Sequence, residues 1–253
     1  MDSFTYSWYL RGLVFAAEIL LATSLVHWIR SSLRGYPEPW SFFLKIISYG
    51  GAAALISAWI EIKYSFNLSS LQQTAPELVN RYGTWFSLLN NLSASAIEEL
   101  AKYVVAIFTI YSARHIHKLS DAIVYMILIG IGFSLVEDLV YSLAPDVYTP
   151  YRILSFFLHS GTSAIIGFAL GRSLSGLAHR FEMIWSMLGA IGLHAAYNLS
   201  VTLQDGQLSF ILTVLIVIYI TLQIFVLFRL AVLEEYRLGH RFAGQTTQRL
   251  LNL

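Results

Sequence analysis

The stretch SDAIVYMILIGIGFSLVEDLVYSL, at residues 120–143, is long and apolar enough to cross a lipid bilayer as a single helix. Such a helix needs about 20 mostly apolar residues, and six other segments of the chain also meet that length. The predicted spans are residues 6–29, 41–62, 86–112, 120–143, 151–172, 182–203 and 208–230. The longest connection, residues 63–85, is polar enough to lie outside the membrane. We therefore predict an all-α fold, a polytopic membrane helix bundle of about seven transmembrane helices.

The composition of the chain supports this assignment. Of the 253 residues, 57% are hydrophobic and 12% are charged, whereas a soluble domain carries about 25% charged residues. The chain has no long polar block, which excludes a soluble enzyme on a single anchor and an intrinsically disordered protein. We expect residues 1–253 to form one integral membrane domain whose function resides within the bilayer.

Net charge and cysteine content narrow the chemistry further. The formal net charge of +1 gives no reason to expect a nucleic-acid partner or a strongly acidic substrate. The chain contains no cysteine, which removes disulfides, thiolate metal sites and cysteine nucleophiles together. The remaining reactive groups are carboxylates, histidines, hydroxyls and any metal that they bind.

Lys and Arg residues are distributed unequally between the two sides of the predicted spans. Ten lie on one side, four on the other and two within spans. The positive-inside rule places the richer side in the cytoplasm, so we expect the N-terminus outside and the C-terminus in the cytoplasm. The richer side carries Arg30, Arg34, Arg114, Lys118, Arg172, Arg180, Arg229, Arg237, Arg241 and Arg249. The N-terminus lacks the basic region of a signal peptide, so the first span is predicted to be a retained helix.

The few ionisable residues inside the spans converge at one depth. An ionisable side chain near the centre of a spanning helix costs about 2.5 to 3.5 kcal/mol on insertion scales, so each is a candidate functional residue. Counted from the cytoplasmic ends of their spans, Glu98, Glu137, His159 and His194 lie 14, 17, 13 and 12 residues deep. At the rise of an α-helix these depths are roughly 18 to 26 Å. Four spans therefore place polar side chains in one slab, from the bilayer centre into its outer half.

Spacing along the spans indicates which side chains can act together. His194 and Asn198 are four residues apart and share a helix face. The adjacent Glu98 and Glu99 point about 100° apart, so they cannot do the same job. A carboxylate in a low-dielectric site suits a general base for water. Two histidines with a carboxylate are also a common ligand set for zinc, with an open position for that water.

These residues carry a resemblance to the PrsW family of intramembrane proteases, which is related to the CAAX prenyl endoproteases. The family's motifs are EExxK, FxxxE, an isolated histidine and HxxxD, and they recur here in that order over residues 85–200. They are matched by Glu98-Glu99-Leu-Ala-Lys102, Phe133-Ser-Leu-Val-Glu137, His159 and His194-Ala-Ala-Tyr-Asn198. The departure is Asn198 in place of an acidic residue, which favours hydrogen bonding over metal ligation at that position.

The resemblance implies hydrolysis of a peptide bond inside the membrane or at its outer edge. PrsW-type proteins are associated with the first, extracytoplasmic cleavage of membrane-bound anti-sigma factors. It therefore implies a single-span membrane protein or peptide as substrate, the lipid bilayer as surroundings, no nucleic acid, and a multi-pass protein of a prokaryotic plasma membrane.

The resemblance also implies roles for the motif residues. Glu98 would be the base that activates water, and Glu99 or Glu137 would help to hold water or metal. His159 would be a second contact to water or metal, and His194 with Asn198 would stabilise the tetrahedral oxyanion. Lys102 and Phe133 would support the site.

A metal is one of two alternatives. The divalent metal expected from the ligand types is zinc, held by His159, His194 and Glu137. Members of this superfamily are described both as metalloproteases and as metal-free glutamate proteases, and the sequence leaves both mechanisms open.

Purely structural roles are the alternative for several residues. Glu98 and Lys102, four apart, could form a self-neutralising pair, and His159 could bond Ser or Thr on a neighbouring helix.

Two other classes of function also compete with a protease. A transporter also concentrates carboxylates in the membrane, but all five prolines of this chain lie in loops, whereas transporters usually have broken helices at midplane. The second competing class is a non-catalytic membrane scaffold, because a protein of that class can have a similar overall outline.

The sequence also predicts contacts for three more charged residues, Glu18, Asp138 and Arg152. Depth alone predicts an ion pair between Glu18 and Lys102. Asp138 is expected to cap its helix or to face the outer water, and Arg152 to anchor the outer end of its span at the interface.

Overall fold

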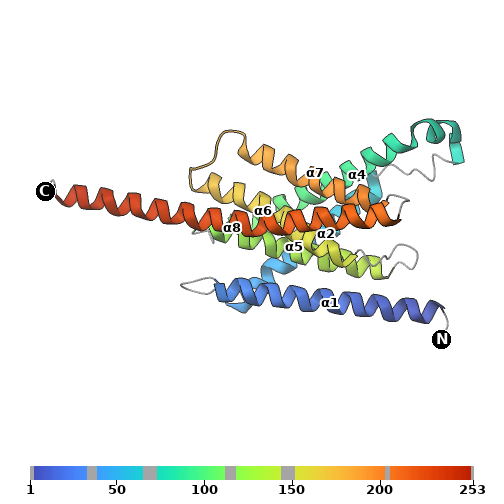
Figure 1. Cartoon of the computed structure of the whole chain (residues 1–253), viewed down its shortest axis with the longest axis horizontal. Helices are drawn as coiled ribbons and strands as arrows, with labels where there is room; N and C mark the ends of the chain where they lie inside the picture. The colour runs from blue at the N-terminus through green and yellow to red at the C-terminus, as the bar shows by residue number, and fades with distance from the viewer. Residues whose placement is uncertain are drawn as a thin grey trace.

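The computed structural model describes residues 3–32, 39–64, 73–111, 118–143, 152–202 and 206–251. The elements in this part of the chain are all helices, with no strand (Figure 1). They are α1 (Ser3–Ser32), α2 (Trp40–Tyr64), α4 (Pro76–Ala106), the π-helical turn η1 (Ile107–Tyr111), α5 (Leu119–Ser142), α6 (Arg152–Leu174), α7 (Glu182–Thr202) and α8 (Gly206–Leu251). Each predicted span corresponds to one long helix, and the predicted all-α bundle is confirmed.

Two helices are longer than the apolar runs that predicted them. Helix α4 begins at Pro76 and not at residue 86, because Pro76 in the first turn and the acidic Glu77 beside it both favour a helix start. Helix α8 continues past residue 230 to Leu251. Glu234 in this extension forms an ion pair with Arg172, and Glu235 accepts a hydrogen bond of 2.7 Å from the Ser120 backbone N–H. Residues that favour a helix start thus account for the extension of α4, and polar contacts accompany the extension of α8.

Five of the helices are long and apolar enough to cross a membrane by length and composition alone. They are the segments Tyr9–Ser31, Trp40–Lys63, Leu119–Ser142, Arg152–Leu174 and Gly206–Leu238. Helices α4 and α7 fall outside this set, and they are the helices that carry Glu98, Glu99 and Lys102 or His194 and Asn198. The chain is a multi-pass integral membrane protein, and α4 and α7 are the helices that carry these polar residues.

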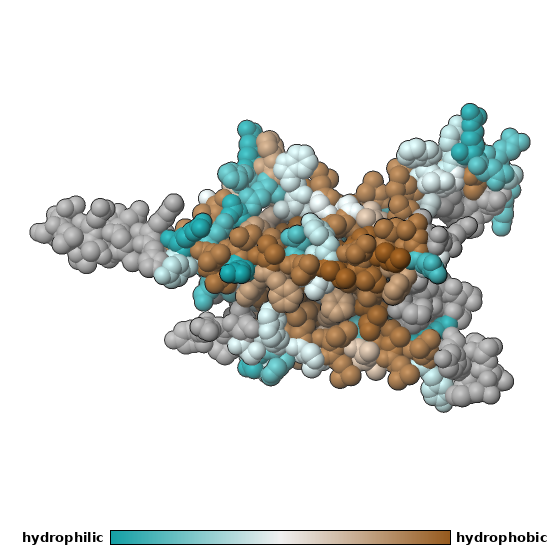
Figure 2. Space-filling model, in the orientation of Figure 1, coloured by the Kyte–Doolittle hydropathy of each residue, from teal (hydrophilic) through white to brown (hydrophobic). Residues whose placement is uncertain are grey.

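Helix α5 is the centre of the bundle. It contacts α1, α2, α4, α6 and α8, and its residues from Leu119 to Ser134 are almost all buried. The exposed surface around it is hydrophobic across the middle of the molecule, whereas hydrophilic residues gather near the two ends (Figure 2). Large side chains such as Trp185 and Leu215 are 70% and 56% exposed. A surface of this kind is stable against lipid tails, not against water.

Glycines let the helices around α5 approach backbone to backbone. A Cβ at Gly132 would collide with the Ile47 carbonyl of α2, and one at Gly50 would collide with the Ile129 carbonyl of α5. A Cβ at Gly167 of α6 would lie 2.8 Å from the Ala122 carbonyl oxygen of α5. These contacts fix α2 and α6 on two sides of α5, and so they set the positions of the side chains beyond them.

Candidate active site

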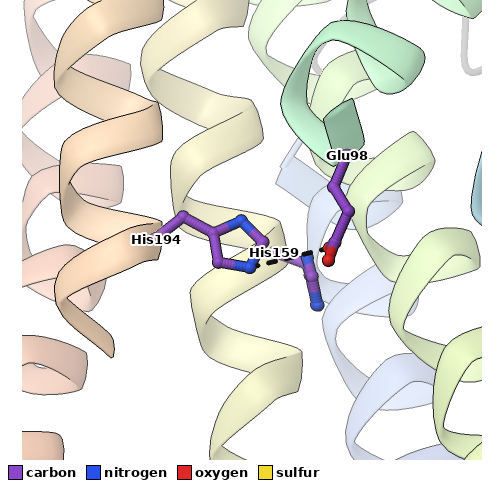
Figure 3. Close-up of side chains that lie close together, drawn as sticks. All are labelled: Glu98, His159 and His194. Atoms are coloured by element: carbon purple, nitrogen blue, oxygen red, sulfur yellow. Dashed lines mark ion pairs between the residues drawn. The ribbon is translucent and has the colours of Figure 1, made fainter. Parts of the chain in front are cut away.

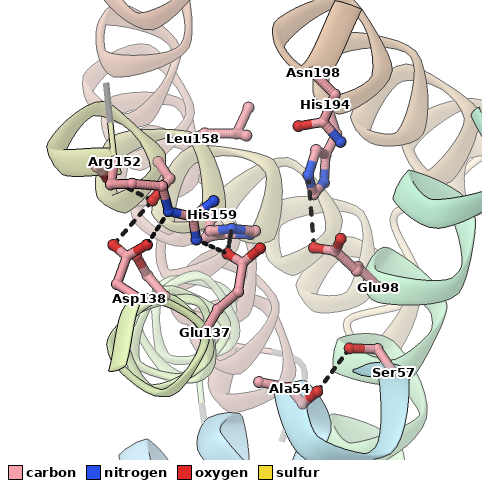
Figure 4. Close-up of polar contacts among 12 residues, drawn as sticks. Ala54, Ser57, Glu98, Glu137, Asp138, Arg152, Leu158, His159, His194 and Asn198 are labelled. Carbon is pink, nitrogen blue, oxygen red and sulfur yellow. Dashed lines mark hydrogen bonds and ion pairs between the residues drawn. The ribbon is translucent and has the colours of Figure 1, made fainter. Parts of the chain in front are cut away.

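Four helices bring the predicted polar residues together inside the bundle. Glu98 comes from α4, Glu137 from α5, His159 from α6 and His194 from α7 (Figure 4). Glu99 also comes from α4. The imidazole rings of His159 and His194 lie 5.0 Å apart, centroid to centroid. All of these side chains are buried except Glu137, whose side chain is 18% exposed. The structure thus places in one cluster residues that are far apart in the sequence.

Glu99 is the most heavily bonded residue of this cluster. Its Oε1 atom accepts hydrogen bonds from Lys102 Nζ at 2.7 Å, His194 Nδ1 at 2.7 Å and Thr162 Oγ1 at 3.0 Å. Glu99 and Lys102 are both completely buried, and each supplies the opposite charge that the other needs there. Glu99 therefore ties α4 to α6 and α7, and its Oε1 atom is not free to act on a substrate.

The hydrogen bond to Glu99 fixes how His194 faces the cavity. Because Nδ1 donates to a carboxylate, the lone pair of a neutral imidazole lies on Nε2. Nε2 is 3.6 Å from Glu98 Oε2 (Figure 3). Glu98 Oε2 is itself buried and has no hydrogen-bond partner among the described residues. A carboxylate oxygen and an imidazole nitrogen thus face each other with their bonding capacity unused.

His159 lies between a cation and an anion. Its Nδ1 atom is 3.2 Å from Lys102 Nζ, and its Nε2 atom is 2.8 Å from Glu137 Oε2. An ammonium can only donate, so Nδ1 accepts and Nε2–H donates to Glu137. The Phe133 ring packs on this pair, 4.8 Å from the imidazole centroid and 4.8 Å from Nζ. Both nitrogens of His159 are therefore occupied.

Arg152 and Asp138 have roles that differ from those expected. Arg152 Nη2 lies 2.9 Å from Glu137 Oε2, and its Nε donates to Asp138. Asp138 is 1% exposed and also accepts a hydrogen bond of 3.1 Å from Ser155 Oγ. The expected anchor and the expected water-facing carboxylate are thus an internal ion pair. The prediction failed because the start of α6 packs against the end of α5 and shields both side chains from the outside.

The predicted pair between Glu18 and Lys102 is wrong. Glu18 is buried, but its Oε1 atom accepts a hydrogen bond of 2.7 Å from Ser134 of α5. Lys102 pairs with Glu99 and not with Glu98, the neighbour four residues away. Depth gives the height of a side chain in the bundle but not the side of the helix on which it lies.

Asn198 contacts α4 one turn away from the glutamates. Its Nδ2 atom donates to Ser95 Oγ at 3.3 Å, and Ser95 lies three residues before Glu98. This contact joins α7 to α4 and helps to fix His194 opposite Glu98.

A cavity of about 500 Å³ reaches the cluster from one side. Glu98 is its only lining residue from α4, and the other walls come from α2 and α5, including Phe133 and Glu137. The cavity also contains Glu61, which the sequence analysis did not single out. The signal was present, since Glu61 is an ionisable residue inside the predicted span 41–62.

The residues fit a divalent metal of the zinc type. Ligand atoms of Glu98, His159 and His194 all lie within 4.8 Å of one another (Figure 3). One carboxylate with two imidazoles is a catalytic zinc set, and Glu99 behind His194 is the second carboxylate that orients such ligands. His159 could join the set only by releasing Lys102 or Glu137. The carboxylate in this group is Glu98, whereas Glu137, expected from the sequence, is held by Arg152.

Comparisons with known proteins agree with the motifs. A family model described as "PrsW family intramembrane metalloprotease" matches residues 38–227. A relative named "Protease PrsW" from Geobacillus kaustophilus (strain HTA426) is 32% identical over 110 residues, 42% of this chain and 49% of that protein. Another of the same name from Bacillus subtilis (strain 168) is 23% identical over 133 residues, 51% of this chain and 61% of that protein. The chain thus matches about half the length of these curated relatives. No solved structure matches.

Proposed function

Because the chain belongs to the PrsW family of intramembrane metalloproteases, we propose that it is an endopeptidase that hydrolyses a peptide bond of a membrane-anchored protein. The observation that carries this proposal is the unused Oε2 atom of Glu98. It is buried, it faces His194 Nε2 at 3.6 Å, and its residue lines a cavity large enough for a peptide segment. A buried carboxylate without a partner is costly for the fold, so it points to a role in chemistry.

In the proposed reaction Glu98 is the general base. It accepts a proton from water as the water oxygen attacks the carbonyl carbon of the scissile bond, and a tetrahedral intermediate forms. The carbon–nitrogen bond then breaks, and the same proton passes from Glu98 to the leaving amine. Glu99 does not take this role, because its Oε1 atom already accepts three hydrogen bonds. Its Oε2 atom is also buried without a partner among the described residues, but Glu99, unlike Glu98, does not line the cavity.

Glu99 acts instead through His194. Its hydrogen bond to Nδ1 holds the ring in place, and its negative charge stabilises the ring when Nε2 is also protonated. Protonated Nε2 can then donate to the oxyanion. Asn198, bonded to Ser95, would supply the remaining amide N–H on the same helix face.

His159 and Glu137 form the opposite wall of the site. Glu137 is held by Arg152 at 2.9 Å and in turn holds His159 at 2.8 Å. We assign Arg152 as a positioning residue, since it touches the reacting groups only through Glu137. These roles of Glu98 and His194 belong to the metal-free form. In the alternative metal form, Glu98, His159 and His194 would instead hold a zinc ion, which would supply Lewis-acid activation of the attacking water.

For the substrate we propose a single-span membrane protein, such as an anti-sigma factor, cut in the outer half of the bilayer. The depth of the cluster supports this position. Its residues lie roughly 18 to 26 Å from the cytoplasmic ends of their predicted spans.

The test is cleavage of single-span candidate substrates by the purified protein in lipid nanodiscs. Replacing Glu98 with Gln keeps the shape of the side chain and removes the base, so we expect cleavage to fall by about 1000-fold or more. Glu77→Gln is the matched control, because Glu77 is an exposed carboxylate in the first turn of the same helix. Retained cleavage in Glu98→Gln would contradict the proposal.

A chelator arm separates the two mechanisms. Loss of cleavage with a chelator and recovery with zinc assign the metal form, and unchanged cleavage assigns the glutamate form.

A further inference from the structure

The cavity beside Glu98 lies between matching faces of two helices. Its α2 face has residues spaced three and four apart, Ala54, Ser57, Ala58 and Glu61. Its α5 face has the same spacing, from Phe133 to Tyr141. The two helices touch backbone to backbone at Gly50 and Gly132 and leave an opening just beyond that point. Small side chains on α2, including Ala54 and Ser57, line this space together with Glu98 of α4 (Figure 4).

The cavity opens toward the lipid. Three of its lining residues are large apolar side chains on the outside of the bundle, namely Leu55, Ile62 and Val140, which are 58%, 83% and 48% exposed. A segment that lies in the bilayer can therefore reach Glu98 sideways, without passing through water.

Glu61 is an ionisable residue of this opening to which no role has been assigned. It forms no hydrogen bond or ion pair with any residue that the structure describes, and it lines the same cavity as Glu98 and Glu137. Glu137 has Arg152 as its partner, whereas Glu61 has none among the described residues. Lys63, two residues along α2, does not line the cavity. Glu61 thus lacks a positively charged partner among the described residues.

Building on the proposed protease function, we infer that this cavity admits the substrate from the lipid and that Glu61 binds a Lys or Arg side chain of the substrate. Glu61 lies three residues before the end of α2. A Lys or Arg near the end of a spanning helix can extend its long side chain along apolar surface toward the interface. The charge and the position of Glu61 thus match a basic residue that flanks the anchored segment. Glu98 would then meet the peptide bond next to that residue.

Cross-linking in lipid nanodiscs tests this inference without any need for cleavage. The chain has no cysteine, so a single new one reports one position only. Leu55→Cys, in a Glu98→Gln background, places a thiol at the cavity mouth. Leu215→Cys of α8 is the matched control, because Leu215 is 56% exposed, does not line the cavity and lies nine residues from the outer end of its helix, as Leu55 does.

The probes are synthetic single-span peptides with one cysteine at midspan and either Lys or Glu beside the apolar segment. We expect disulfide formation at Leu55→Cys to be about tenfold faster for the Lys peptide than for the Glu peptide. Glu61→Gln should abolish this preference and Glu61→Lys should reverse it, while Leu215→Cys should show none. Equal rates for both peptides at Leu55→Cys, or a preference that survives Glu61→Gln, would overturn the inference. If the Leu55→Cys protein selects the Lys peptide but the wild-type protein cleaves no substrate, the proposed protease function alone is overturned.

Discussion

The two sides of the site differ in how their polar groups are satisfied. On the side of α6 and α7, a continuous set of ion pairs and hydrogen bonds joins Glu99 Oε1, Lys102, His159, Glu137 and Arg152. The second oxygen of Glu99 has no partner among the described residues, but Glu99 does not line the cavity. On the side of α2, Glu98 Oε2 and Glu61 face a cavity without hydrogen-bond partners among the described residues. Low dielectric makes every buried pair strong and every unpaired group costly. The paired side therefore holds the geometry, and the open side is where substrate and water are handled.

This comparison predicts opposite results for two neighbouring glutamates. Glu99→Gln leaves the buried Lys102 ammonium without its counter-charge, and breaking a buried pair costs about 3 to 5 kcal/mol of unfolding free energy. Glu98→Gln removes no ion pair with Lys102 and should leave stability nearly unchanged while it abolishes cleavage. Thermal unfolding followed by tryptophan fluorescence in detergent measures the difference.

A second variant guards this prediction against a trivial loss of folding. Lys102→Met in the Glu99→Gln background removes the stranded charge, so it should recover part of the lost stability. If Glu98→Gln destabilises the protein as much as Glu99→Gln does, the division into a paired and an open side is wrong.

The sequence predicts the helices, and the convergence of their polar residues, better than it predicts which charges pair. Apolar runs fix the height of each side chain, which is why Glu98, His159 and His194 were expected in one slab. Which partner a charge selects depends on the rotation of each helix and on its neighbours. Lys102 could reach Glu18, Glu98 or Glu99 by depth and spacing, and only the packed bundle selects Glu99.

Helix ends show a second limit of the sequence. A basic residue at the end of a span usually faces water or lipid headgroups, and this rule predicted an anchor at Arg152. The rule fails because the C-terminal part of α5 presents Glu137 and Asp138 to the same place. The motifs, in contrast, identified residues that the structure brings together, since chemistry at one site requires them to meet.

The next prediction concerns Arg152, which pairs with Glu137 and Asp138 on the paired side. Arg152→Ala removes the cation that holds Glu137 and Asp138, and with a side chain 16% exposed we expect a loss of about 2 to 3 kcal/mol. Turnover should fall about 10- to 100-fold, because Glu137 no longer orients His159. Arg152→Lys should restore much of the stability and less of the turnover, since one ammonium cannot hold two carboxylates with the geometry of a guanidinium.

Unfolding curves and cleavage rates measured on the same preparations separate these effects. Arg81→Ala is the control, because Arg81 is an exposed residue of α4. Turnover that is unchanged in Arg152→Ala would show that Glu137 and His159 need no positioning from α6.

The smallest expected effects come from two substitutions that add carbon atoms. Gly132→Ala adds one methyl group where α5 packs against α2, and Ala58→Leu adds a larger group beside the cavity. Gly132→Ala puts a Cβ against the Ile47 carbonyl, and overpacking of this kind costs about 1 to 3 kcal/mol because α2 must move. Ala58→Leu adds three carbons, but it adds them to a cavity of about 500 Å³, so we expect a change in stability of less than about 1 kcal/mol. The same side chain would occupy space proposed for substrate, so KM should rise several-fold with kcat little altered. Unfolding curves for both variants and a full substrate titration for Ala58→Leu measure these effects. If the larger addition at Ala58 is the more disruptive of the two, the space beside Glu98 is part of the packing of the fold and not a place for substrate.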